Sequence, residues 1–155
     1  MWEFSTDTWS SGYPFGSQRW QLSLNAPGAL DMMRMDQLLD GVPWWNLVPS
    51  GQNGMKRLVT AGGGFYGSTA YVTSAATRDG STLLAYVPST GTGTRTVTVD
   101  MTALSGSARG RWYNPTNGAY TNIATSIPNI GTRQFTTPGN NGTGANDWVL
   151  VLDRG

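Results

Sequence analysis

The stretch that decides the fold is Asp147-Trp148-Val149-Leu150-Val151-Leu152, near the C-terminal end of the sequence. Successive side chains of a β-strand point to opposite faces of a sheet, and after the first residue both alternating sets are apolar here. Such a strand must be covered on both faces, so we expect it in the middle of a sheet. The stretch 97–101, Val-Thr-Val-Asp-Met, instead alternates apolar and polar residues and predicts a strand with one buried face.

Further short strands, separated by turns, are predicted from residue 69 onward. The turn signals Asp79-Gly80 and Thr116-Asn117-Gly118 each separate two of them. About seven short strands at this spacing predict a mainly β protein with an antiparallel β-sandwich fold, and a closed barrel is the alternative. The expected strands are 70–77, 82–87, 95–101, 108–113, 119–124, 132–136 and 147–153.

One helix is predicted ahead of the strands, over residues 25–40. Pro27 suits the first turn of a helix, while Gly41 can end it and Pro43 prevents its continuation. Apolar residues at near-helical spacing, among them adaptable methionines, are expected to pack between this helix and the sandwich. The methionines and tryptophans expected in this core are Met32, Met33, Met35, Trp44 and Trp45.

The composition excludes several classes of function. The 155 residues include no cysteine and no histidine, which excludes disulfide bonds, a cysteine nucleophile, a Ser-His-Asp triad and the usual zinc sites. We expect neither a metal ion nor another cofactor. The net charge is only +1 and the basic residues are scattered, so nucleic acid is not an expected partner.

The sequence and its composition also indicate the compartment in which the protein functions. No apolar stretch approaches the length of about 18 residues that a membrane helix needs, so no membrane contact is predicted. Met1-Trp2-Glu3-Phe4 lacks the basic and apolar regions of a signal peptide. The charged fraction is 12%, and there are 21 glycines and 7 tryptophans. These features are typical of an extracellular β protein that handles neutral polar ligands such as sugars.

Carboxylates are the first candidates for catalysis. Glycosidic hydrolysis by the usual route needs two of them on one substrate, about 5 to 9.5 Å apart. The chain has one Glu and eight Asp. Asp100 and Asp147, both at strand ends, are the weak candidates for an acid/base pair, although nothing in their spacing argues for it. A structural hydrogen-bonding role for Asp147 is the favoured alternative.

Aromatic residues are the candidates for ligand binding. Trp112 and Tyr113 end a strand just before the turn at 114–118, and Tyr120 follows that turn. Because side chains alternate along a strand, one of the first two rings should point inward and the other outward. An outward Tyr113 paired with Tyr120 could stack on a sugar ring. The alternative, which we favour, is that both tyrosines cover the hydrophobic edge of a hairpin.

Several short segments of the sequence resemble those of a known protein family. Asn25-Ala26-Pro27-Gly28-Ala29 and the run 41–49, Gly-Val-Pro-Trp-Trp-Asn-Leu-Val-Pro, resemble the last helix and exit of an apiosidase-like glycoside hydrolase barrel. The stretch from Ala75 onward resembles the small β-domain that follows such barrels, known as the "putative collagen-binding domain of a collagenase". The matching motifs in that stretch are Asp79-Gly80, Leu84-Ala85-Tyr86-Val87-Pro88, Val97-Thr98-Val99-Asp100, Arg111-Trp112-Tyr113-Asn114-Pro115 with Gly118, Thr137-Pro138-Gly139 and Asp147-Trp148-Val149-Leu150-Val151-Leu152.

The resemblance implies a domain organisation and a compartment. Residues 1–50 would be the remnant of a barrel end, 51–68 a crossing segment and 69–155 the sandwich. The parent protein would be extracellular or periplasmic, with its catalytic carboxylates on barrel strands upstream, so no catalytic residue is carried over. The chain also departs from the family: Tyr13-Pro14-Phe15-Gly16 has no preceding His, and Asn114 stands where Asp is usual.

Three functions are therefore considered. The first is a non-catalytic accessory β-sandwich of a glycoside-hydrolase-like protein, with a polysaccharide or oligosaccharide as ligand. The others are a small stand-alone glycan hydrolase that uses Asp carboxylates, and a module that binds collagen or another protein. Without barrel neighbours, the apolar side of the helix must fold back on the sandwich or meet another copy. We therefore expect a homo-oligomer formed through residues 1–50.

Overall fold

The computed structural model describes residues 27–91, 93–142 and 144–154. These residues form one α-helix, two short 3-10 helices and nine strands. In chain order the elements are α2 (Pro27–Asp40), η1 (Trp44–Asn46), β1 (Leu47–Pro49), β2 (Val59–Ala61), β3 (Thr73–Thr77), β4 (Thr82–Val87), β5 (Thr96–Asp100), η2 (Met101–Ala103), β6 (Ala108–Tyr113), β7 (Tyr120–Ile127), β8 (Thr132–Thr136) and β9 (Trp148–Asp153).

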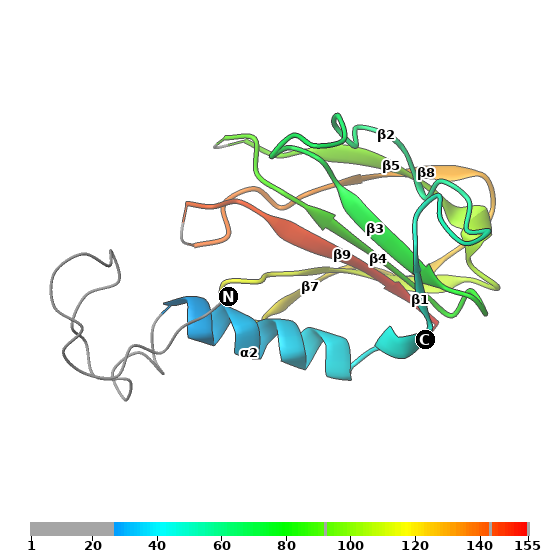
Figure 1. Ribbon diagram of the computed structural model, residues 1–155, viewed down its shortest axis with the longest axis horizontal. Helices are drawn as coiled ribbons and strands as arrows, with labels where there is room; N and C mark the ends of the chain where they lie inside the picture. Colours follow the sequence, from blue (N-terminus) through cyan, green and yellow to red (C-terminus); the bar gives the residue numbers. More distant parts are fainter. Residues whose placement is uncertain (1–26, 92, 143, 155) are drawn as a thin grey trace, which may run out of the picture.

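The strands form two antiparallel sheets packed face to face, which confirms the predicted sandwich. The large sheet has the order β1-β3-β4-β9-β6-β7, and the small sheet has the order β2-β5-β8. In Figure 1 the small sheet lies above the large one and α2 lies below both, so the molecule has three layers. Strand β9 pairs with β4 on one side and β6 on the other, which confirms its predicted central position.

All seven predicted strands are present within a few residues of the expected bounds. The predicted turn at Asp79-Gly80 joins β3 to β4, and it requires glycine for two reasons. Gly80 has a φ of 68°, and a Cβ atom there would lie 2.7 Å from the backbone nitrogen of Ser105. Two strands were not predicted: β1 pairs with β3, and β2 pairs with β5. Each has only three residues, too few to show a recognisable period.

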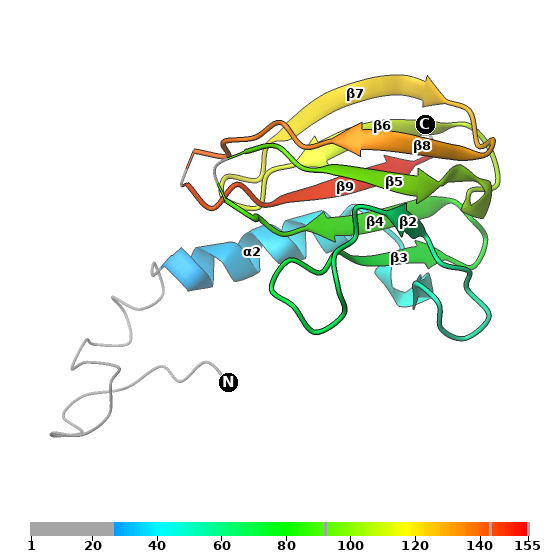
Figure 2. The ribbon, with the colours of Figure 1, turned by 90° about the horizontal axis from the view of Figure 1, so that it is seen from above.

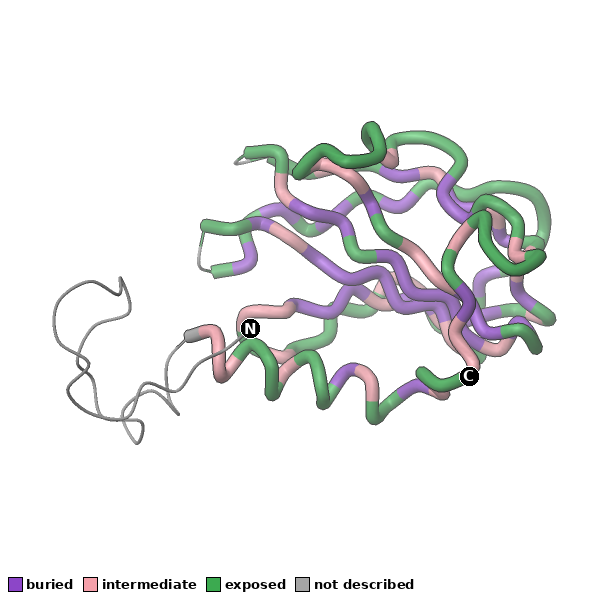
Figure 3. The backbone as a smooth tube through the Cα atoms, viewed as in Figure 1, coloured by how far each residue is buried: buried purple, intermediate pink, exposed green. Residues whose placement is uncertain are grey.

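The main core lies between the two sheets. It is built by the inward-facing residues of each strand, and Figure 3 shows the buried backbone concentrated along the central strands. Large fully buried members are Leu58, Leu83, Val97, Val99, Met101, Ile127, Leu150 and Leu152. Burying one such side chain stabilises the fold by about 1.5–3 kcal/mol relative to leaving it in water.

A second core lies between α2 and the outer face of the large sheet. Leu38 and Val42, at the C-terminal end of the helix and just beyond it, pack with Leu84 of β4 and with Val149 and Val151 of β9. This layer explains the apolar character of both faces of β9: one face meets the small sheet, and the other meets the helix. Among the described residues no helix is long and apolar enough to cross a membrane.

The prediction that the methionines and tryptophans fill this core was wrong. Met32, Met33 and Met35 are all about half exposed, Trp44 is 54% exposed and Trp45 is 75% exposed. The helix is apolar on more than one side, and it turns Leu38 rather than Met33 toward the sheet. The two tryptophan rings contact each other edge to face, with centroids 6.1 Å apart.

Candidate functional site

The outer face of the large sheet has a covered part and an open part. Helix α2 covers it over β4, β9 and the end of β6, where the Tyr113 hydroxyl donates to the backbone oxygen of Arg34 at 2.7 Å. Beyond the helix, β6 and the edge strand β7 carry polar and aromatic side chains at or near the surface. We call this set the Tyr-Arg platform; its residues are Arg109, Arg111, Tyr120, Asn122 and Asp153.

The strand register places the platform residues on one face. Tyr113 is paired with Tyr120, Arg111 with Asn122, and Arg109 with Asp153 of β9. Side chains directly opposite each other on antiparallel strands share a face. Because Tyr113 faces the helix, its neighbours at alternate positions, Arg111 and Arg109, face the same way.

Close contacts hold the platform together. The Arg111 guanidinium lies over the Tyr120 ring, 4.2 Å from its centroid, a favourable cation–aromatic arrangement. Asp153 receives both arginines: Nε and Nη2 of Arg109 donate to it at 3.2 and 2.8 Å, and Nη2 of Arg111 donates at 2.6 Å. Tyr120 also contacts Tyr113, with ring centroids 5.0 Å apart.

The platform carries more positive than negative charge. Two guanidinium groups share the single carboxylate of Asp153. The hydrogen bonds to Asp153 and its charge raise the pKa of Arg109 above its ordinary value. Burial raises the pKa of Tyr120, with Asp153 adding to the effect and both arginines opposing it. At neutral pH the platform therefore presents a neutral phenol beside two cations and one anion.

A pocket of about 600 Å³ lies next to the platform, between the N-terminal half of α2 and the loops at one end of the large sheet. Leu30, Met35 and Leu38 of the helix line one side, and Val149 and Pro115 line the other. Charged and polar members of the lining are Asp31, Arg34, Tyr86, Tyr113, Thr116 and Asp147. Two residues that the sequence analysis singled out, Tyr113 and Asp147, thus meet in one pocket.

Asp147 is held in the pocket wall by two donors. The Tyr86 hydroxyl donates to its Oδ2 at 3.0 Å, and Nδ2 of Asn141 donates to its Oδ1 at 2.8 Å. Burial raises the pKa of Tyr86 to about 12, with the Asp147 charge and hydrogen bond adding to the effect. On the helix side of the same pocket, Arg34 forms an ion pair with Asp31 at 2.8 Å.

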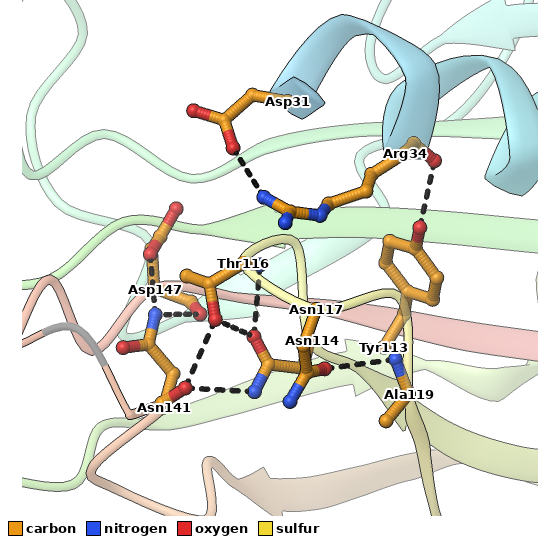
Figure 4. Close-up of polar contacts among 9 residues, drawn as sticks. All are labelled: Asp31, Arg34, Tyr113, Asn114, Thr116, Asn117, Ala119, Asn141 and Asp147. Atoms are coloured by element: carbon orange, nitrogen blue, oxygen red, sulfur yellow. Dashed lines mark hydrogen bonds and ion pairs between the residues drawn. The ribbon is translucent and has the colours of Figure 1, made fainter. Parts of the chain in front are cut away.

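Asn114 connects the loops that frame the pocket (Figure 4). Its side-chain oxygen accepts from the backbone nitrogen of Thr116 at 2.9 Å, and its Nδ2 donates to the backbone oxygen of Asn141 at 2.9 Å. The side chain is buried, so its own amide oxygen and nitrogen would be costly to leave unpaired. Asn114 is thus a structural residue that ties the turn after Tyr113 to the loop before β9.

Residues 66–153 match the model of a protein family described as the "putative collagen-binding domain of a collagenase". The chain belongs to that family. No curated protein matches the chain in a sequence comparison.

Two solved structures share the fold of this family member. One is a glycoside hydrolase with a TM-score of 0.71 and 22% identity, in a match that covers 94% of this chain and 29% of the other. The second is a glycoside hydrolase family 5 protein from Bacteroides vulgatus, with a TM-score of 0.73 and 19% identity, and the match covers 97% of this chain and 30% of the other. The chain therefore spans about a third of the length of these proteins.

The fold does not bring together Asp100 and Asp147, the two candidates for an acid/base pair. Asp100 ends β5, accepts from the backbone nitrogen of Thr102 at 3.0 Å and pairs with Lys56 at 3.2 Å. Asp147 precedes β9 at the other end of the sandwich, and β5 and β9 run in the same direction in Figure 2. Five residues of extended strand separate the two ends by on the order of 15 Å, too far for both carboxylates to act on one glycosidic bond.

The contacts of Asp100 explain why its pKa lies below the ordinary value for an aspartate. Partial burial acts to raise it, but the hydrogen bonds from Thr102 and the nearby charge of Lys56 outweigh burial and leave it below its ordinary value. In the described part of the chain, no group of three or more carboxylates is close enough to hold a metal ion.

The three aromatic candidates have different surroundings. Trp112 points inward and is buried in the main core. Tyr113, the next residue along the strand, points to the opposite face of the sheet, as expected. There α2 covers it and leaves only 2% of it exposed. Tyr120 is 40% exposed, so it alone of the three offers a ring to a ligand. Sugar binding by these residues stays a prediction, and the geometry favours Tyr120.

The site residues predicted from the sequence did not include Arg109, Arg111, Asp153 or Tyr86. The available signal was the alternation in 108–113, Ala-Arg-Gly-Arg-Trp-Tyr, which puts two arginines and a tyrosine on one face of a strand. Which acid would meet these arginines depends on the pairing of β6 with β9, and a local pattern does not specify that pairing.

Proposed function

We propose that this chain is a non-catalytic accessory β-sandwich of a glycoside-hydrolase-like protein and that it binds glycan on the Tyr-Arg platform. The exposed Tyr120 ring on an open sheet face carries this proposal. A sugar ring can place its C–H face on an aromatic ring, while neighbouring polar groups contact its hydroxyls. Arg109 and Asn122 supply donors, and Asp153 supplies an acceptor.

The likeness to two larger glycoside hydrolases supports the accessory role. The match covers nearly all of this chain but only about a third of each of those proteins. The exposed apolar residues Met32, Met33, Trp44 and Trp45 would then form the surface that packs on a catalytic domain. Large exposed apolar side chains grouped in one region are typical of such interfaces.

Stand-alone hydrolysis is the second candidate, because one observation favours it. Asp31 and Asp147 both line the pocket under α2, so two carboxylates are available to one ligand there. Each already has a partner: Asp31 pairs with Arg34, and Asp147 accepts from Tyr86 and Asn141. An acid/base role would require these contacts to be replaced by contacts with substrate.

A polysaccharide panel tests the proposal, with retention in affinity electrophoresis and reducing-sugar release as readouts. We expect retention without release, and we expect Tyr120→Ala to abolish the retention. Tyr66→Ala is the matched control, because Tyr66 is also exposed but lies before β3, away from the platform.

Three outcomes would contradict the proposal. Retention that survives Tyr120→Ala would place the binding site elsewhere. Release of sugar that Asp147→Asn removes would make the chain a compact glycosidase. Retention on collagen that soluble sugars do not compete away would favour the protein-binding role in the family's description.

A further inference from the structure

Resting on the proposed glycan binding, we infer that the Tyr-Arg platform selects an acidic glycan, one whose sugar rings carry a carboxylate or a sulfate group. The ring would stack on Tyr120, and its anionic group would meet Arg109. The observations that point to this ligand class are the excess of positive charge, the exposure of Arg109 and its closeness to the only open ring among the three aromatic candidates.

The charge balance gives the first argument. A guanidinium group carries five N–H donors, and Arg109 uses two of them on Asp153. Arg111 pairs with the same carboxylate. Among the described residues no second carboxylate forms an ion pair with either arginine. A ligand anion would therefore neutralise a charge that the protein leaves uncompensated.

The two arginines differ in their access to a ligand. The Arg111 side chain is only 17% exposed and lies over the Tyr120 ring, so little of it is available to a ligand. The Arg109 side chain is 41% exposed. One oxygen of Asp153, Oδ2, accepts from Arg109 at 2.8 Å and from Arg111 at 2.6 Å, so Arg109 lies next to the guanidinium that covers the Tyr120 ring. A sugar on the open side of the ring can thus direct a substituent toward Arg109.

Other cations of the described chain lack this combination. Arg34 and Lys56 each form an ion pair with an aspartate. Arg95 donates to three backbone oxygens. Arg133 lies over Phe135, but that ring is buried. Among the described residues, the platform alone combines a cation over an exposed ring with a carboxylate that two arginines share.

The experiment compares a carboxylated glycan with its uncharged ester and adds a sulfated glycan as a second charged ligand. Binding to polygalacturonate, to its fully methyl-esterified form and to a sulfated galactan is measured at low and at high salt. We expect the charged glycans to bind about fivefold tighter than the ester at low salt, from a partly exposed ion pair, and salt to remove the difference. The charged glycan whose affinity Arg109→Gln lowers more carries the anionic group that the platform selects.

Two variants locate the effect. Arg109→Gln should remove the preference for charge and keep weak binding to the ester, because Asp153 retains Arg111 as partner. Arg78→Gln is the control, since Arg78 is exposed at the end of β3, on the far side of β4 and β9 from the platform. The thermal unfolding midpoint of each variant shows whether it is folded.

The outcomes separate the two proposals. Equal binding to acid and ester, or a charge preference that survives in folded Arg109→Gln, overturns the acidic-glycan inference and leaves the glycan-binding proposal standing. No binding to any of the three glycans or to the wider panel contradicts glycan binding itself.

Discussion

Tyr113 and Tyr120 face each other across one strand pair, yet they belong to different regions of the molecule. Tyr113 lies under α2 and is 2% exposed, whereas Tyr120 lies beyond the helix and is 40% exposed. The same face of the same sheet thus becomes core in one place and candidate binding surface in the next. The position of the helix, rather than the residue type, assigns the role.

The largest expected effect is a difference in stability between the two tyrosines. Tyr113→Ala removes a buried ring and its hydrogen bond to Arg34, so it should lower the free energy of unfolding by about 3–5 kcal/mol. Tyr120→Ala should cost about 1 kcal/mol or less, because much of the ring is already in water. Urea unfolding of both variants measures the difference. Equal losses would mean that the helix does not cover Tyr113 in solution.

The strand framework behind this comparison was predictable from the sequence. The alternation in 97–101 and the two-sided apolar character of 148–152 placed two strands correctly, and turn residues placed the hairpins. The end of the helix at Asp40 was also predictable, from Gly41 and Pro43, whereas residues 25 and 26 of the predicted helix lie outside the described residues. The side of the helix that faces the sheet was not predictable, because leucines and methionines lie on different sides of it and only tertiary packing selects between them.

The turn that joins the two tyrosines should be the next most sensitive feature. Asn114→Asp keeps the shape of the side chain but replaces the donor that faces the backbone oxygen of Asn141 with a second acceptor. We expect a loss of about 1–3 kcal/mol at neutral pH. The loss should shrink at acidic pH, where a protonated carboxyl group can donate again.

Asn117→Asp provides the control for this variant. Asn117 lies in the same turn but is exposed, and its side chain accepts from Ala119 through the oxygen that Asp retains. Chemical denaturation at two pH values compares the variants. If Asn114→Asp proved as stable as the control, the amide would not connect the two loops as the structure indicates.

Tyr86, which lines the pocket under α2, should lose its proton at an unusually high pH. The pKa of Tyr86 is about 12, above the ordinary tyrosine value of about 10. Its protonated form therefore stabilises the fold fully below about pH 10, and this contribution is lost as the pH rises through about 12. The effect on stability should be small, because Tyr86 is partly exposed and solvent screens the charge of Asp147.

Absorbance at high pH can isolate this titration. Subtracting the curve of Tyr86→Phe from that of the unmodified chain gives the ionisation of Tyr86 alone. The same subtraction in an Asp147→Asn background should give a lower midpoint, because the neighbouring negative charge is gone. An unchanged midpoint would show that burial alone raises the pKa of Tyr86.

The candidate site was less predictable than the fold, for a physical reason. The position of Tyr120 just after the turn that follows Tyr113 identified it as a residue worth testing, but the sharing of Asp153 by two arginines depends on contacts across 42 and 44 residues. Asp100 and Asp147 looked equivalent in the sequence, since each lies at a strand end. Their separation follows from the shared direction of β5 and β9, which lie in different sheets, and only the way in which the two sheets pack determines that direction (Figure 2).

The smallest expected effect on stability concerns the outward side of α2. We predicted a homo-oligomer through residues 1–50, and Met33 and Trp45 are the most exposed apolar residues of the described part of that segment. Met33→Lys combined with Trp45→Lys should change the free energy of unfolding of each subunit by only about 0.5 kcal/mol, because neither side chain belongs to either core. The same change places charges on the surface where copies would meet, so sedimentation at micromolar concentration should shift toward the monomer. An unmodified chain that already sediments as a monomer would contradict self-association and would leave this apolar surface to a partner such as the catalytic domain proposed above.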